Sequence, residues 1–89
     1  MLHVAYDAFS EKTCKLGEYL KDFDSNEKEI KKIIDDIPLY WVSPESEAFY
    51  KRFKREKKNK DSVKELAVEM YSRMKELCDA FDKVVDARL

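Results

Sequence analysis

Apolar side chains recur along the first part of the chain at alternating steps of three and four. Nine of the eleven positions in this stripe are apolar or aromatic, and the exceptions are Thr13 and Glu27. A sustained heptad spacing is typical of an amphipathic helix that packs along one face. The stripe therefore predicts a helix over about residues 2–37. Its members are Leu2, Tyr6, Phe9, Thr13, Leu16, Leu20, Phe23, Glu27, Ile30, Ile34 and Ile37.

A second stripe with the same spacing begins at Phe49. It fails at Glu56 and Lys60 and resumes at Val63, after which flanking apolar residues widen it. This pattern predicts a second helix over about residues 44–87. The stripe consists of Phe49, Phe53, Glu56, Lys60, Val63, Ala67, Met70, Met74, Leu77, Phe81 and Val84.

The segment between the two stripes holds both prolines of the chain. Pro38 disfavours a helical conformation at the residue before it, so the first helix should end near Ile37. Ser43, Pro44 and Glu45 then suit the cap, the first position and the first turn of a new helix. We therefore expect a turn over residues 38–43 within a single all-α domain spanning residues 1–89, folded as an antiparallel two-helix hairpin.

Two polar segments resemble helix starts inside the predicted helices. They are Asp24–Glu27 and Ser62–Glu65, and both have the spacing of a capping box. Each would begin a new helix if the chain broke there. The unbroken heptad phase favours continuous helices across residues 24–27 and 59–62 instead.

Composition supports long helices. Of 89 residues, 42% are charged and 44% are hydrophobic, which is too apolar for a disordered chain. One glycine leaves few tight turns, which argues against a β-sandwich or barrel. The longest apolar run, residues 37–42, has six residues, so we expect no membrane span. Residues 1–7 lack a basic region and a long apolar region, so we expect synthesis in the cytosol without a conventional signal peptide.

A two-helix hairpin cannot cover its own apolar stripes, because each helix shields only one side of the other. At about 25 cal/mol per Å², leaving several large side chains in water would forfeit several kcal/mol. We therefore expect two hairpins to associate into a four-helix bundle, as a homodimer or with another helical hairpin. The side chains predicted to form that interface are Leu16, Leu20, Phe23, Met70, Met74, Leu77 and Phe81.

The predicted turn carries the most informative motif. Trp41 stands just before the helix start at Ser43, and Ala48 and Phe49 follow on the new helix. We expect Trp41 to lie over the start of the second helix, Ala48 to permit close approach of the first helix, and Phe49 to enter the core. This stretch resembles the WXG100 family, the small Esx-like proteins of type VII secretion systems. Their signature is Trp-x-Gly in the loop of a helical hairpin, often continuing toward Ser-Glu-Ala-Phe.

The resemblance has two departures. Ser43 stands at the family's glycine position, where serine before proline can act as a helix cap. The Tyr-x-x-x-Asp/Glu export motif is absent from the C-terminal part, since Tyr71 is followed four residues later by Lys75. The resemblance implies a non-catalytic substrate or targeting chaperone of type VII secretion, read by the secretion ATPase and exported without a cleaved signal peptide. It also implies pairing with itself or with the helical N-terminal domain of an effector.

A basic segment offers an alternative function. Residues 51–60 hold seven basic side chains in ten, whereas the whole chain has a net charge of −1. Such a segment could bind nucleic acid or an acidic partner, as in a regulatory helical bundle. Nucleic acid is the weaker of these two, because the domain is not basic overall. The candidate residues are Lys51, Arg52, Lys54, Arg55, Lys57 and Lys58.

The sequence offers no chemistry for catalysis, metal binding or a cofactor. Asp22–Asn26 begins like a calcium loop, but Glu27 and Ile33 stand where that loop needs glycine and glutamate. A single histidine and two cysteines provide too few ligands for a zinc site. In the predicted hairpin Cys14 and Cys78 lie too far apart for a disulfide, and we expect both to act as small apolar side chains.

Overall fold

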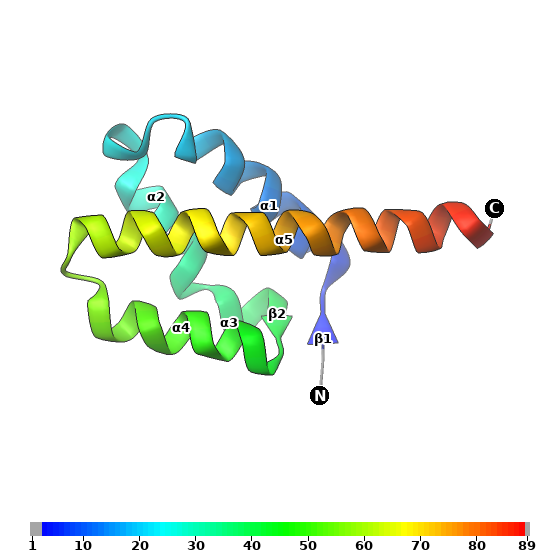
Figure 1. The fold of residues 1–89 in the computed structure, drawn as a ribbon. Helices are drawn as coiled ribbons and strands as arrows, with labels where there is room; N and C mark the ends of the chain where they lie inside the picture. The colour runs from blue at the N-terminus through cyan, green and yellow to red at the C-terminus, as the bar shows by residue number, and fades with distance from the viewer. Residues whose placement is uncertain (1–2, 89) are drawn as a thin grey trace.

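The computed structural model describes the backbone of residues 3–88 and the side chains of residues 5–83. Within this part the fold is all-α, as predicted, with one pair of very short strands (Figure 1). The order of elements differs from a hairpin, because each predicted helix is divided. The elements are β1 (His3–Val4), α1 (Tyr6–Leu20), α2 (Phe23–Asp35), α3 (Ile37–Tyr40), β2 (Trp41–Val42), α4 (Pro44–Glu56) and α5 (Lys60–Arg88).

The first break separates α1 from α2, so the expectation of a continuous helix across residues 24–27 was wrong. Asp22 ends the connection and caps α2, since its Oδ1 accepts a hydrogen bond from the Ser25 N–H at 3.2 Å. Asn26 has a non-helical backbone, and its side-chain amide donates to the carbonyl oxygen of Tyr19 at 3.3 Å. Local bonds from these short polar side chains therefore replace the helical hydrogen bonds of one turn.

The second break separates α4 from α5, which corrects the predicted continuity across residues 59–62. Asn59 lies before α5, and its Oδ1 accepts a hydrogen bond from the Ser62 N–H at 3.1 Å. The helix thus restarts at Asn59, three residues before the serine that the sequence suggested as a cap. The two failures of the apolar stripe, Glu56 and Lys60, flank this connection. Breaking the helix here costs little stability, because Glu56 and Lys60 give the stripe no apolar side chain to bury and Asn59 caps the new helix.

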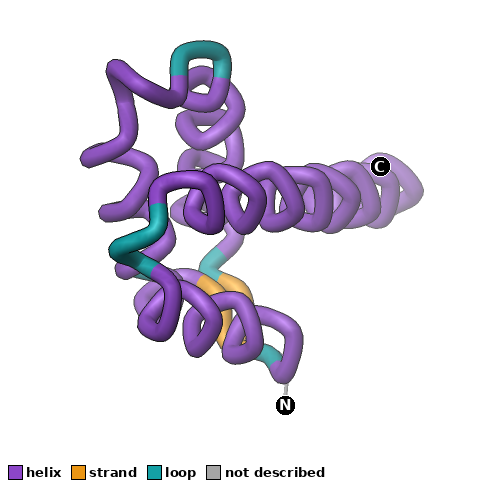
Figure 2. Tube along the Cα trace, turned by 60° about the vertical axis from the view of Figure 1, so that its left-hand side comes forward, coloured by secondary structure: helices purple, strands orange, loops and turns teal. Residues whose placement is uncertain are grey.

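The predicted turn contains more structure than expected. Residues 37–40 form the short helix α3, and Trp41–Val42 form β2, which pairs antiparallel with β1. In this pairing His3 lies opposite Val42 and Val4 lies opposite Trp41. Figure 2 shows the strand pair beside α4. The predicted restart of the helix at Ser43 and Pro44 is confirmed.

Helix α5 organises the rest of the molecule. In Figure 1 it runs across the whole fold, with α1 on one side, α3 and α4 on the other, and α2 passing behind it. Helices α1 and α5 run antiparallel, because Tyr6 contacts Asp82 at one end and Gly17 lies against Tyr71 further along. The antiparallel pairing of the first and last parts of the chain is therefore shared with the predicted hairpin, although the breaks fold α2 and α4 into the same core.

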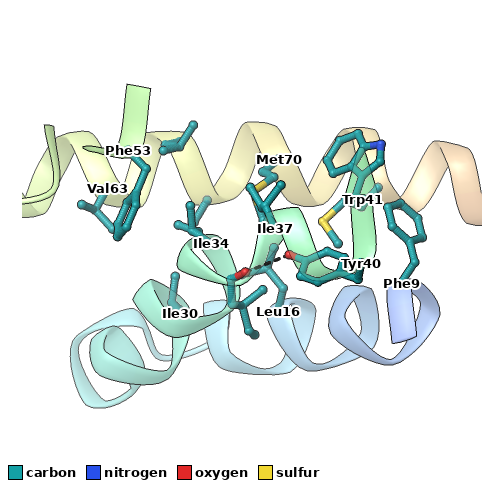
Figure 3. Close-up of a cluster of buried hydrophobic side chains, with 14 of the residues drawn as sticks. Phe9, Leu16, Ile30, Ile34, Ile37, Tyr40, Trp41, Phe53, Val63 and Met70 are labelled. Carbon is teal, nitrogen blue, oxygen red and sulfur yellow. Dashed lines mark hydrogen bonds between the residues drawn. The ribbon is translucent and has the colours of Figure 1, made fainter. Parts of the chain in front are cut away.

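The divided helices enclose one apolar core (Figure 3). A straight hairpin leaves one side of each stripe in water, whereas folding back at two breaks buries most of the described apolar members of both stripes within one chain. Burial of this apolar surface is the main favourable term in forming the arrangement. The buried hydrophobic side chains are Phe9, Leu16, Phe23, Ile30, Ile33, Ile34, Ile37, Tyr40, Trp41, Phe53, Val63, Leu66, Ala67, Met70, Met74 and Cys78.

Candidate functional site

Trp41 lies in the core at the junction of β2 and α4, with 1% of its surface exposed. Its ring meets Phe9 from α1 edge-to-face, with 5.4 Å between ring centroids. On the other side Phe49 from α4 lies 5.9 Å away in a tilted arrangement. The indole thus joins the first helix to the start of the fourth, and it is sealed from solvent rather than displayed.

Two serines fix the backbone on either side of this junction. The Ser43 hydroxyl accepts a hydrogen bond from the Ser46 N–H at 3.0 Å, and Ser46 Oγ accepts one from the Ser43 N–H at 2.9 Å. Ser46 Oγ also lies 3.0 Å from the carbonyl oxygens of Trp41 and Ser43, to which its hydroxyl can donate. This reciprocal capping box sets where α4 begins. The role of Ser46 was missed in the sequence, although its spacing from Ser43 is the signal.

The other two motif residues behave differently from each other. Phe49 is half-buried and packs on Trp41. Ala48 is exposed, so the expectation that it lets the first helix approach was wrong. Trp41 Nε1 is buried and has no hydrogen-bond partner among the described residues, and the indole's observed contacts are packing contacts.

A small apolar hollow of about 240 Å³ opens beside the motif, between α3 and α4. Next to it Leu39 is 78% exposed and Val42 is 42% exposed. Glu47 and Lys51 supply charge at its edge. The residues that line the hollow are Ile37, Pro38, Trp41, Val42, Ser46, Glu47, Tyr50 and Lys51.

The structure places the side chains predicted for a partner interface inside this chain. Leu16, Phe23, Met70 and Met74 are buried, with exposed fractions of 4% or less. Leu20 and Leu77 are partly buried against the same core. Phe81 is partly exposed and lies edge-to-face with Tyr6, at 5.9 Å between ring centroids. The four buried residues are therefore not accessible to a partner in this fold, because the folded-back helices of the same chain already cover them.

Three of the six candidate basic residues in segment 51–60 form ion pairs within the chain. Lys54 Nζ lies 2.6 Å from Asp35 Oδ1 on α2, which holds the pKa of that carboxyl below its usual value, chiefly through the hydrogen bond. Arg52 pairs with Glu69 on α5 and, at 3.3 Å, with Glu56. Arg55 lies 3.5 Å from Glu56 as well. The other three members, Lys51, Lys57 and Lys58, are exposed.

The two cysteines and Tyr40 are the remaining side chains that could carry chemistry. Cys78 is buried with its Sγ 3.6 Å from Thr13 Oγ1, and burial raises the pKa of its thiol. Cys14 is exposed, so the expectation that both cysteines act as small apolar side chains fits the buried Cys78 and not Cys14. Tyr40 donates a hydrogen bond from its hydroxyl to the Ile33 carbonyl at 2.8 Å (Figure 3), and burial raises its pKa.

In the part of the chain that the structure describes, no group of three or more His, Cys, Asp or Glu side chains is arranged to hold a metal ion. No helix among the described residues is both long enough and apolar enough to cross a membrane. Comparison with family models, with curated proteins and with solved structures finds no match to this chain.

Proposed function

We propose that this chain is a non-catalytic WXG100-like protein of type VII secretion, acting as a secreted substrate or as a targeting chaperone. The observation that carries the proposal is the junction at Trp41. The tryptophan, the Ser43 cap and Phe49 come together at a helix start, in the order in which the family's motif places them. Pairing with a second copy or with the helical domain of an effector is part of the proposal.

The fold changes which surface such a partner would use. Because Leu16, Met70 and Met74 are internal, a partner must bind side chains that this chain leaves exposed. Leu39 and Val42 are the exposed apolar residues nearest the motif, and Val42 also lines the hollow of about 240 Å³. We therefore assign recognition to this face beside the turn. The buried Trp41 indole would stabilise the backbone that forms this face. The secretion ATPase would bind the complex of this chain with its partner.

The test is export from a bacterium that carries a type VII system. The amount of the chain, and of the system's other substrates, is measured in the culture supernatant with and without the secretion ATPase and with the chain deleted. We expect export of the chain itself, or of an effector that requires it, to stop without the ATPase. Export that is unchanged in both deletions would contradict the proposal.

A pair of matched variants locates the surface. Leu39→Asp places a charge on the face beside the turn, whereas Val68→Asp does the same at a 49% exposed valine on α5. We expect the first variant to lose pairing, measured as mass by light scattering and as export, and the second to retain both. Equal behaviour of the two variants would show that this face is not the recognition surface.

A further inference from the structure

The fold creates a basic groove from two segments that lie far apart in the sequence. A hollow of about 340 Å³ lies between α2 and α4, and five of its seven lining residues are lysines. The lysines of α2 belong to no motif in the sequence, so this juxtaposition arises only when α4 folds back against α2. The groove is lined by Lys28, Lys31, Lys32, Asp35, Phe53, Lys54 and Lys57.

The positive charge of the groove is only partly neutralised. Lys31 pairs with Glu27 at 3.0 Å, Lys32 with Asp36 at 3.2 Å, and Lys54 with Asp35 at 2.6 Å. Among the described residues, Lys28 and Lys57 have no such ion pair, and both are exposed. The groove therefore keeps an excess of positive charge, in a chain whose net charge is −1.

Asp35 is a carboxylate of this chain that already lies in the groove. Its side chain sits among the lysines and accepts a hydrogen bond from Lys54. That bond is the largest cause that lowers its pKa, and the charges of Lys54, Lys57 and Lys32 act in the same direction. An external carboxylate placed beside Lys28 and Lys57 would meet the same kind of stabilisation.

The walls of the groove suit a helix better than a nucleic acid. Lys28 and Lys32 on α2 are one turn apart, and Lys57, the residue that directly follows α4, lies about one turn beyond Lys54, so positive charges repeat at about 5.4 Å along each wall. Acidic side chains three or four residues apart on a helix repeat at the same interval. Single-stranded nucleic acid, by contrast, is usually held by stacking of its bases on exposed aromatic faces. Phe53 is only 4% exposed, and the Tyr50 ring already has Lys54 Nζ 5.0 Å from its centroid.

We propose that the groove between α2 and α4 is a docking site for an acidic helical segment of a partner protein, with Asp or Glu side chains at three- to four-residue spacing. This surface is distinct from the face beside Trp41 and does not depend on a role in secretion. Lys28 and Lys57 supply the new ion pairs, and the lysines paired within the chain supply the surrounding positive field. Binding is electrostatic and weakens with salt.

The experiment uses the full chain and a fluorescently labelled, alanine-based helical peptide with glutamate at every third or fourth position. Fluorescence anisotropy measures binding, and the same peptide with glutamine is the control ligand. We expect the glutamate peptide to bind at low salt, and binding to weaken when sodium chloride rises from about 0.05 M to about 0.2 M. The glutamine peptide should not bind.

Two double variants with the same change in net charge locate the site. Lys28→Glu with Lys57→Glu reverses charge in the groove, whereas Lys12→Glu with Lys83→Glu reverses it on α1 and α5. We expect the groove variant to lose about tenfold or more in affinity and the control variant to lose much less. Circular dichroism checks that both variants remain folded.

Several outcomes would overturn the proposal. These are no binding of the glutamate peptide at low salt, equal binding of the glutamine peptide, or equal loss in the two double variants. A single-stranded oligonucleotide is titrated in parallel. If it binds more tightly than the glutamate peptide and is lost in the groove variant, the groove is a nucleic-acid site and not a peptide site.

Discussion

The phenol ring of Tyr71 on α5 lies against the backbone of Gly17 on α1. A Cβ atom at position 17 would come within 2.7 Å of Tyr71 Cε1 and within 2.9 Å of its Cζ and hydroxyl oxygen. Gly17 is the one glycine of the chain and lies inside a helix, where glycine is unfavourable. The close approach of the tyrosine ring explains why this position takes a residue without a side chain.

The first prediction concerns this pair. Gly17→Ala gains about 1 kcal/mol of helix propensity but displaces the tip of the half-buried Tyr71 ring, which offsets part or all of that gain. We expect little or no net stabilisation in the wild-type background, measured by urea unfolding. In a Tyr71→Ala background the clash is absent, so the same substitution should stabilise by about 1 kcal/mol. Stabilisation of similar size in both backgrounds would contradict the contact.

The second prediction concerns the capping box at the start of α4. Ser46→Ala removes the acceptor of the buried Ser43 N–H, which should cost about 1–3 kcal/mol of unfolding free energy. Ser72→Ala, at an exposed position on α5, should change stability by less than about 0.5 kcal/mol. Trp41 fluorescence follows unfolding in both variants. If they are equally stable, the hydrogen bonds around Ser46 do not hold the junction.

The third prediction tests the break before α5. Asn59 caps α5, so Asn59→Ala should destabilise the chain by about 0.5–2 kcal/mol. In a continuous helix the same substitution would have the opposite sign, because alanine is a better helix former than asparagine. Thermal and urea unfolding measure the sign of the change in unfolding free energy. A more stable Asn59→Ala variant would favour the uninterrupted hairpin over the divided one.

The fourth prediction is a dependence on alkaline pH. Burial raises the pKa of Tyr40 above its usual value near 10, so its neutral form is favoured in the folded state. Its contribution to stability is therefore present below about pH 10 and is lost as the pH rises through the folded pKa. Tyr40→Phe should cost about 0.5–1.5 kcal/mol at neutral pH through the lost bond to Ile33.

The measurement is urea unfolding of both proteins from about pH 8 to about pH 11. The difference between wild type and Tyr40→Phe should shrink toward the alkaline end, since only the wild type carries the buried phenol. A difference that stays constant over this range would mean that Tyr40 ionises as freely in the folded chain as in the unfolded one.

The helical class and the helix start at Ser43 could be predicted because they depend on local signals. Apolar spacing specifies which residues are buried, and Phe9, Leu16 and Met70 are indeed in the core. The spacing does not specify what covers them, since a stripe buried by a partner and a stripe buried by the same chain have the same pattern. For this reason Leu16, Phe23, Met70 and Met74 were expected at an interface between chains, whereas they lie in the core of the single chain.

The breaks were missed for a related reason. Asp22 and Asn59 cap their helices with single side-chain bonds, each worth about 1 kcal/mol, and such a bond decides between a bent and a straight helix only when tertiary packing rewards the bend. The basic groove was missed as well, because Lys28 and Lys57 become neighbours only after the chain has folded back.

The pairing of α1 with α5 has a consequence for how the chain is made. Helix α1 packs on its neighbour α2 and also on α5, which begins forty residues after α1 ends. During synthesis the part of α1 that α5 covers stays in water until α5 has emerged from the ribosome, an interval of several seconds at about 5–20 residues per second. Contacts between such distant segments also form slowly, because a long loop must close first. During translation this uncovered part of α1 is therefore an apolar surface that can aggregate.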